Sequence, residues 1–233
     1  MKREQTMTFY DKLADVTAAR RQDLYAIPLL QQGVQGQVSL QTYVAFLAEA
    51  YHHVRHTVPL LMACGSRLPQ YYEWLREAIA RYIDEELGHQ EWILNDIAAC
   101  GADAETVRDS DPGLATEIMV AYAWDTIQRG NPLGLFGMVY VLEGTSVTLA
   151  THAASALART LSLPDSAFTY LNSHGTLDIE HIDYFSTLMN RISDPADQHA
   201  IMHAAGVFFV LYGNIFRSLD NRNTAIRGNE QPG

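Results

Sequence analysis

Helix-favouring residues dominate this sequence, and no stretch alternates apolar and polar residues over the length of a β-strand. Ala, Leu, Gln, Glu and Met are frequent throughout, and these residues enter a helix at little cost in free energy. Prolines and glycines divide the chain into segments of helical length. The sequence therefore predicts an all-α protein with helices over about residues 7–30, 40–64, 71–100, 114–129, 133–161, 165–191 and 195–219.

Prolines and glycines also set the expected ends and kinks of these helices. Pro28 lies near the end of the first, and Pro59 predicts a kink in the second, because a proline inside a helix costs about 3 kcal/mol. The third is expected to run unbroken to a stop at Gly101. No internal repeat or low-complexity linker is present, so we expect one domain over residues 1–220 and a polar, disordered tail over 221–233.

The charge balance narrows the classes of partner. The formal net charge is −11, from 16 basic and 27 acidic residues, whereas proteins that bind nucleic acid present basic patches. The sequence has no Lys- and Arg-rich amphipathic helix of the kind that docks on an anionic membrane. The two cysteines, Cys64 and Cys100, form no CxxC motif, and the N-terminus lacks an apolar signal-peptide core. We expect a cytoplasmic protein with no nucleic-acid or membrane partner.

The first candidate for chemistry is the segment His174-Gly-Thr-Leu-Asp178-Ile-Glu-His181. Its two histidines and Asp178 are spaced i, i+4 and i+7, so at about 100° per residue they fall within about 60° of arc on one helix face. Imidazole and carboxylate together suit iron, manganese or zinc. The alternative is a polar helix face without a metal, and partners elsewhere in the chain decide between the two.

Glu143 is the second candidate, because it is the only charged residue between Pro132 and Thr151. Burying a lone carboxylate in such an apolar helix is costly unless the carboxylate is paired or bound to a cation. The alternatives are a side chain that reaches solvent past Gly144 and a buried carboxyl that is hydrogen-bonded to Thr or Tyr.

The pair Glu86 and His89 is the third candidate. On one continuous helix, Glu-x-x-His places both groups about 60° apart on one face, a spacing that recurs in di-iron carboxylate proteins. By itself this motif is weak, since an acidic, solvated helix face produces it too. Gly88 would leave room beside Glu86, which favours Glu86 as a carboxylate that bridges or shifts between metals.

Together these segments supply three carboxylates and three imidazoles from three predicted helices: Glu86, His89, Glu143, His174, Asp178 and His181. Zinc usually takes four ligands, whereas two six-coordinate irons need about twelve donor atoms, so six residues favour a dinuclear iron site with open positions. Iron can bind and reduce O2, which no amino-acid side chain does alone.

A rival cluster lies in the second predicted helix. Glu49 and His52 repeat the Glu-x-x-His spacing, and His52 and His56 are spaced i, i+4. This segment would offer a seventh ligand, orient other ligands, or bind a substrate carboxylate through Arg55. A polar stripe that faces water is the alternative. We assign these residues to the substrate pocket, with Phe46, Phe136 and Tyr140 as apolar walls.

The joint pattern resembles the heme-oxygenase-like di-iron oxidases and oxygenases, also known as iron-containing redox enzymes, within the TenA/PqqC-like fold group. The resemblance covers about residues 7–220, and His-x3-Asp-x2-His is its most specific part. It implies a single bundle of about seven helices that holds two irons, often weakly, with manganese as the alternative metal. The family's ligands fall on the six residues above, with catalytic roles for Glu86, Glu143 and Asp178.

The resemblance also implies an activity and its rivals. Related enzymes use O2 on small molecules such as fatty acids and amino acids, by oxidative decarboxylation or N-oxygenation, and a homodimer is expected. A self-sacrificing tyrosine–lysine mechanism is disfavoured because only Lys2 and Lys12 are present. The rivals are a metal-free TenA/PqqC-like enzyme and a non-catalytic protein that binds iron or another ligand.

Overall fold

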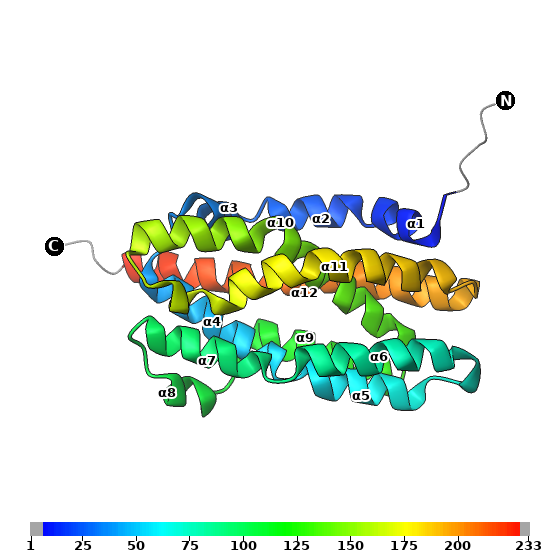
Figure 1. Ribbon diagram of the computed structural model, residues 1–233. Coiled ribbons are helices and arrows are strands. Elements are labelled where there is room, and N and C mark those ends of the chain that lie inside the picture. Colours follow the sequence, from blue (N-terminus) through cyan, green and yellow to red (C-terminus); the bar gives the residue numbers. More distant parts are fainter. Residues whose placement is uncertain (1–6, 229–233) are drawn as a thin grey trace.

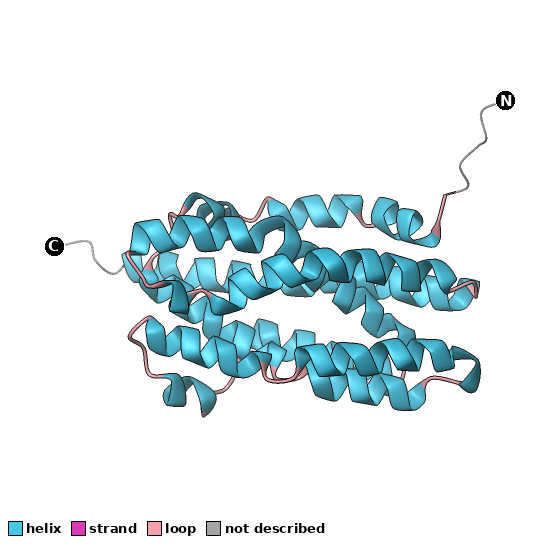
Figure 2. Cartoon of the chain, in the orientation of Figure 1, coloured by secondary structure: helices cyan, strands magenta, loops and turns pink. Residues whose placement is uncertain are grey.

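A computed structural model describes residues 7–228, with the side chains of 174–181 and 221–228 outside the described part. The described residues form helices only, as Figure 2 shows. The α-helices are α1 (Phe9–Val16), α2 (Ala18–Tyr25), α3 (Pro28–Gln35), α4 (Leu40–Val54), α5 (Thr57–Arg67), α6 (Glu73–Glu86), α7 (His89–Ala99), α8 (Ala104–Arg108), α9 (Leu114–Gln128), α10 (Leu135–Leu161), α11 (Thr169–Arg191) and α12 (Pro195–Gly228). Three short 3-10 helices, at Gln70–Tyr72, Pro132–Gly134 and Asp165–Ala167, precede α6, α10 and α11.

The helices lie roughly along one direction in a single bundle (Figure 1). In that view α1 to α3 lie along one side, α4 to α9 lie along the other, and α11 and α12 run between them. α10 crosses the bundle obliquely, from α9 at its start to α3 at its end, and packs most extensively against α11 and α12. The all-α helical bundle expected from the sequence is confirmed.

The helices outnumber the seven expected because three of the predicted segments are split and because the short helix α8 was not predicted. The second breaks after Val54, one turn before Pro59, because a proline ring clashes with the carbonyl four residues earlier, here that of Arg55. The first breaks at Thr17 and again before Pro28. The third, which was expected to be continuous, breaks at Leu87 and Gly88. This last break matters for the site.

The central helices are held close together. A side chain at Gly137 of α10 would place its Cβ 2.5 Å from the backbone nitrogen of Ala205 in α12, so only glycine allows this approach. By length and composition alone, the segments Pro132–Leu161 and Pro195–Asp220 would be able to cross a membrane. In the bundle, however, 56% and 50% of the most apolar 18-residue stretch of each segment is buried. Packing in the core accounts for their apolar composition.

A buried carboxylate fixes the start of α11. Asp96 of α7 has no exposed surface and accepts hydrogen bonds from the backbone N–H groups of Thr169 (3.1 Å) and Tyr170 (2.8 Å). These are first-turn N–H groups that have no partner within the helix. Asp96 and His89 lie on the same helix, so α7 ties one candidate ligand to the register of α11.

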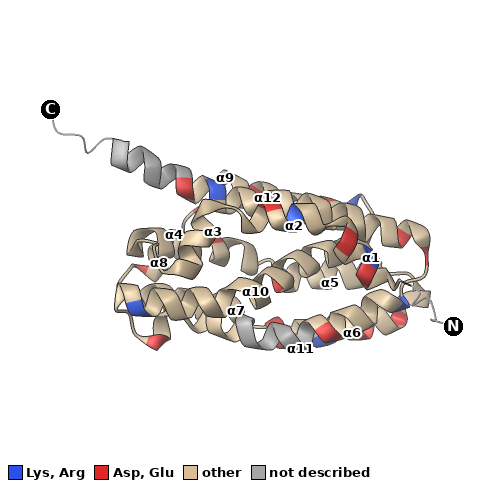
Figure 3. Cartoon of the chain, turned by 90° about the horizontal axis from the view of Figure 1, so that it is seen from above, with Lys and Arg blue, Asp and Glu red and all other residues tan. Residues whose placement is uncertain are grey.

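At the other end of the chain, α12 is helical to Gly228, past the end expected near residue 219. Part of the segment predicted to be a disordered tail is therefore helical. Charged positions are spread over many helices, and Lys and Arg gather in no patch in the view of Figure 3.

Candidate metal centre

Two of the predicted carboxylates, Glu86 and Glu143, line one cavity at the centre of the bundle. We call it the carboxylate cavity. Glu86 comes from the end of α6 and Glu143 from the middle of α10, and both point into a space of about 80 Å³. Its other polar walls are His53, Thr57, Tyr82, Ser146, Tyr170 and Tyr212. Residues far apart in the sequence thus meet here, as the sequence predicted for this pair.

Glu86 and His89 do not share one helix, contrary to the prediction. Glu86 is the last residue of α6, Leu87 is extended, and Gly88 has φ 90°, a left-handed conformation that glycine adopts at little cost. His89 is the first residue of α7, and its Nδ1 lies 3.0 Å from Glu86 Oε2. The two groups meet across the break, and the role of Gly88 is this conformation rather than space beside Glu86.

His89 is firmly held. It is 1% exposed, and its ring stacks on Trp92 with 4.0 Å between the ring centroids. Glu86 is also buried, at 9% exposure. A buried carboxylate and imidazole at this separation stabilise each other or share a cation.

Glu143 acts on the tyrosines around it. Tyr82 is 2% exposed, and burial, followed by the negative charge of Glu143, raises the pKa of its hydroxyl well above the usual value. The same charge contributes to a raised pKa of Tyr10, on the other side of α10, where burial is again the main cause. Tyr82 therefore remains a protonated donor beside the carboxylate cavity.

The remaining predicted ligands, His174, Asp178 and His181, lie in α11, and their side chains are outside the described residues. The backbone of α11 passes the carboxylate cavity all the same. Tyr170 lines the cavity, and the Tyr184 ring lies 6.1 Å from that of Tyr82.

Within the described part of the chain, no group of three or more His, Cys, Asp or Glu side chains forms a metal-binding cluster. Half of the six predicted ligands fall outside that part. The described half consists of Glu86, His89 and Glu143, and these are the residues gathered at and beside the carboxylate cavity.

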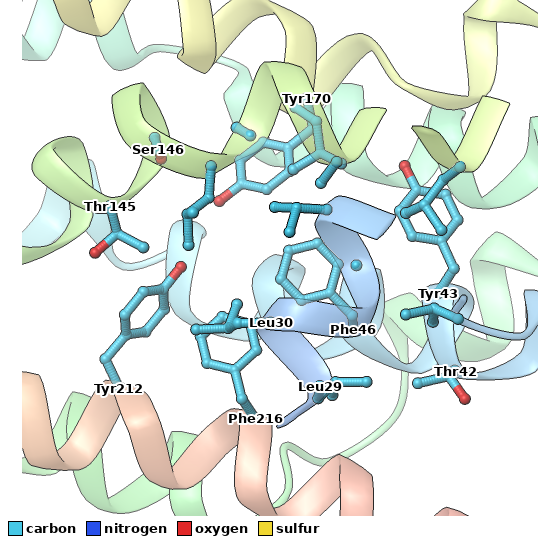
Figure 4. A pocket seen from close by; sticks show the side chains of 18 residues that line it. Leu29, Leu30, Thr42, Tyr43, Phe46, Thr145, Ser146, Tyr170, Tyr212 and Phe216 are labelled. Carbon is cyan, nitrogen blue, oxygen red and sulfur yellow. The ribbon is translucent and has the colours of Figure 1, made fainter. Parts of the chain in front are cut away.

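A second cavity, which we call the aromatic channel, lies next to the first. The two share Ser146, Tyr170 and Tyr212 as walls. Figure 4 shows the rings of Phe46, Tyr170, Tyr212 and Phe216 around one space, from α4, α11 and α12. Its volume is about 90 Å³, and none of the described residues that line it is charged.

The channel follows the C-terminal half of α10. Its lining on this helix begins at Thr145 and Ser146 and ends at Leu157. At 1.5 Å per residue, the span from Ser146 to Leu157 is about 16 Å. The channel is therefore long and narrow, and suits the apolar chain of an elongated molecule.

Of the seven residues assigned to the substrate pocket, Phe46 alone lines either of these two cavities. The structure instead places His53 there, 2% exposed and edge-on to Tyr212 with ring centroids 6.0 Å apart. Helix geometry explains why His53 lines the cavity and the predicted residues Glu49 and His52 do not. Positions 46, 50 and 53 of α4 fall within about 60° of arc, as do 49, 52 and 56, but the two sets lie on different faces.

The other α4 candidates face α9 or solvent, which corrects their assignment. Glu49 is buried and accepts hydrogen bonds from Gly113 N (3.1 Å) and Thr116 Oγ1 (2.6 Å) at the start of α9. His52 Nε2 lies 3.0 Å from Ser110 Oγ. Arg55 and His56 line neither cavity: Arg55 is exposed over the ring of Tyr51, and His56 lies edge-on to Trp124. Glu49 and His52 hold α4 to the start of α9 and the loop before it.

The two α10 candidates also lie elsewhere. Phe136 has no exposed surface and packs against Phe185 in the core. Tyr140 lines a third cavity, on the other side of α10 from the carboxylate cavity, where it meets Arg21. An apolar helix has apolar residues on every face, so its sequence does not reveal which face lines a cavity.

The bundle and its central cavity define a class of protein, the heme-oxygenase-like fold. A domain of unknown function with this fold from Shewanella denitrificans aligns with a TM-score of 0.82 at 22% identity, covering 94% of each chain. A TenA homologue from Pseudomonas syringae aligns at 0.76 and 15% identity, covering 91% of this chain and 93% of that one. Heme oxygenase-1 from Synechocystis, in complex with heme, aligns at 0.74 and 12% identity, covering 95% and 96%.

Residues 44–213 match the family described as iron-containing redox enzymes, and the chain belongs to this family. The matched segment includes all six predicted ligands. No curated protein sequence matches the chain. Family membership makes iron the expected metal and an oxidation–reduction reaction the expected activity.

Proposed function

We propose that this protein is a non-heme di-iron enzyme that activates O2 to oxidise a small organic substrate. The observation that carries the proposal is that Glu86 and Glu143 reach one buried cavity, beside His89 and along the helix that bears His174, Asp178 and His181. Six side chains would hold about two iron ions per chain, with manganese as the alternative metal.

The described residues fit such a centre. Two ligands that are each about 2.1 Å from one metal ion and about 90° apart are about 3.0 Å from each other. The 3.0 Å between His89 Nδ1 and Glu86 Oε2 matches this separation. Carboxylate charge in an apolar bundle also favours a bound cation, because burying that charge without a partner is costly.

Iron bound there would supply the binding and reduction of O2. The protein's own groups around such a site are proton-bearing side chains and apolar walls. Tyr82, whose pKa is raised by burial and by Glu143, keeps its hydroxyl proton, and the His53 imidazole lines the same cavity. The aromatic channel presents mostly apolar walls on the side on which a substrate would lie.

The channel favours a substrate with an alkyl or aryl body over a compact amino acid. Its described walls carry no charge, and Arg55, expected to bind a substrate carboxylate, lies away from it. An elongated molecule in the channel would place one end near Glu86 and Glu143. Oxidative decarboxylation and N-oxygenation both act at such an end.

The proposal extends to the localisation, the partners and the oligomeric state of the protein. The net charge of −11 and the scattered basic residues favour a cytoplasmic protein without nucleic-acid or membrane partners. We propose a homodimer, with O2 and a small molecule as its reaction partners.

Metal analysis after anaerobic loading with Fe(II) tests the proposal. We expect about two irons per chain in the wild type, and less iron in Glu86→Gln and Glu143→Gln, because an amide is a weaker ligand than a carboxylate. The matched control is Glu91→Gln, an exposed carboxylate paired with Arg108, which should leave the iron content unchanged.

Two outcomes would contradict the proposal and favour its rivals. Oxidation activity that survives full removal of iron by a chelator would favour a metal-free TenA-like enzyme. Stoichiometric iron that consumes no O2 with any reductant or substrate would favour a non-catalytic iron-binding protein.

A further inference from the structure

We propose that a third cavity, between α1–α2 and α10, is a binding site for a small organic carboxylate with an apolar or aromatic body. We call it the arginine cavity, after Arg21. Tyr140, Gly144 and Thr148 line it at intervals of one helical turn. Met138 and Leu142, on the opposite face of α10, line the carboxylate cavity. This site is distinct from the carboxylate cavity and does not depend on iron.

The cavity presents an arginine that has no acidic partner in the described structure. Arg21 Nη1 donates to Ala14 O (3.3 Å) and Tyr140 Oη (3.1 Å), while Nη2 and Nε make no hydrogen bond among the described residues. The planar guanidinium matches the two oxygens of a carboxylate. The chain has an excess of acidic residues, with a net charge of −11, yet none of the described ones pairs with the half-buried Arg21. Its guanidinium is therefore available to an anionic ligand.

Two tyrosine hydroxyls add donors to the same space. Tyr140 Oη accepts from Arg21, so its own proton remains available to an acceptor in the cavity. Tyr10 Oη makes no hydrogen bond within the described residues, and burial raises its pKa, so it also keeps its proton. Arg21 and Tyr140 therefore offer donors to a carboxylate, and Tyr10 offers one to a polar group elsewhere on the ligand.

The size and walls of the cavity indicate the rest of the ligand. Its volume is about 270 Å³, against about 90 and 80 Å³ for the aromatic channel and the carboxylate cavity. Its inner wall is apolar, formed by Val141, Ile182 and Phe209, and the tyrosine rings flank it. Sites of this kind combine apolar walls with a few polar groups that orient the ligand.

Nearby charges set the orientation. Asp183 and Glu143 both act on Tyr10, whereas Arg21 opposes them there. A bound carboxylate is therefore favoured at the Arg21–Tyr140 end, with its uncharged body toward Tyr10 and the inner wall.

Benzoate is a suitable probe, measured by calorimetric titration of the full-length protein at fixed pH and ionic strength. A hydrogen-bonded charge partner contributes enough that Arg21→Gln should weaken binding by about 10- to 100-fold. Arg20→Gln, at the exposed neighbouring position, is the matched control and should bind benzoate as the wild type does.

Benzamide, which keeps the ring but not the charge, should bind the wild type at least about 10-fold more weakly than benzoate. This comparison needs no variant, so it decides the matter even if Arg21→Gln folds poorly. Equal binding of benzoate and benzamide, equal loss in the Arg20 and Arg21 variants, or no benzoate binding at millimolar concentration would each overturn the proposal.

Discussion

At the scale of single residues, the neighbours His52 and His53 show how position on a helix decides the role of a side chain. Both are buried, at 4% and 2% exposure. His53 lines the carboxylate cavity, whereas His52 meets Ser110 beside α9. One step along a helix turns a side chain by about 100°, which separates a cavity wall from a contact between helices.

His53 is expected to matter for O2 chemistry, and His52 is not. In the iron-loaded protein supplied with a reductant, His53→Gln should slow O2 consumption by about 100-fold if the imidazole transfers protons. His52→Gln is the matched control and should stay close to the wild-type rate. Iron content measured in parallel distinguishes a lost proton donor from a lost ligand. Similar rates in the two variants would remove His53 from the site.

The sequence pointed to two carboxylates that meet in one cavity, but it missed most of the residues that line the pocket. Glu143 could be singled out because a lone charge in an apolar helix requires a partner, and the structure places it with Glu86. His53 could not, because the Glu-x-x-His spacing of Glu49 and His52 resembled a motif. In the structure, Glu49 does not line the pocket, because its buried carboxylate accepts hydrogen bonds from the start of α9.

At the scale of elements, the break between α6 and α7 shapes the candidate centre. Helix-favouring residues surround it, so the sequence predicts one helix, and only Gly88 marks the position. The left-handed conformation of Gly88 lets the chain turn and brings His89 Nδ1 within 3.0 Å of Glu86 Oε2. The ends of long helices were predictable from Pro and Gly, but a glycine alone does not distinguish a break from a tolerated helical position.

Replacing Gly88 should destabilise the protein. A Cβ at this position meets no atom within 4 Å, so the cost of Gly88→Ala is conformational, about 1–2 kcal/mol in the free energy of unfolding. Gly206→Ala is the control, because Gly206 is helical and also has open space around its Cβ position. It should stabilise the protein by about 0.5–1 kcal/mol. Urea denaturation measures both, and equal effects would contradict a special role for the break.

At the scale of the whole molecule, the carboxylate cavity and the aromatic channel lie next to each other along α10, and we refer to the two together as the passage. The shared walls Ser146, Tyr170 and Tyr212 come from three helices, so the passage exists only in the assembled bundle. The sequence predicted the helices that build it, and their helical class and order are confirmed. It did not predict the passage, because cavities depend on how helix faces oppose one another.

Ligand length should show where the passage ends. For linear n-alkanols, affinity should rise by about fourfold per methylene until the channel is filled. Ala153→Phe, which adds a ring to the channel wall, should end this rise at a shorter chain. Ala121→Phe, at an exposed position of α9, is the control and should leave the series unchanged. A series that is identical in all three proteins would place alkyl chains elsewhere.

The two faces of α4 also bear on how such a protein diversifies over evolutionary time. Glu49 and His52 secure α9, while Phe46 and His53 line the passage, so the two tasks rest on separate sets of residues. A substitution on the inner face alters which molecules fit without loosening the contact between helices. Inherited changes in substrate preference are therefore open to this scaffold at little cost to its stability.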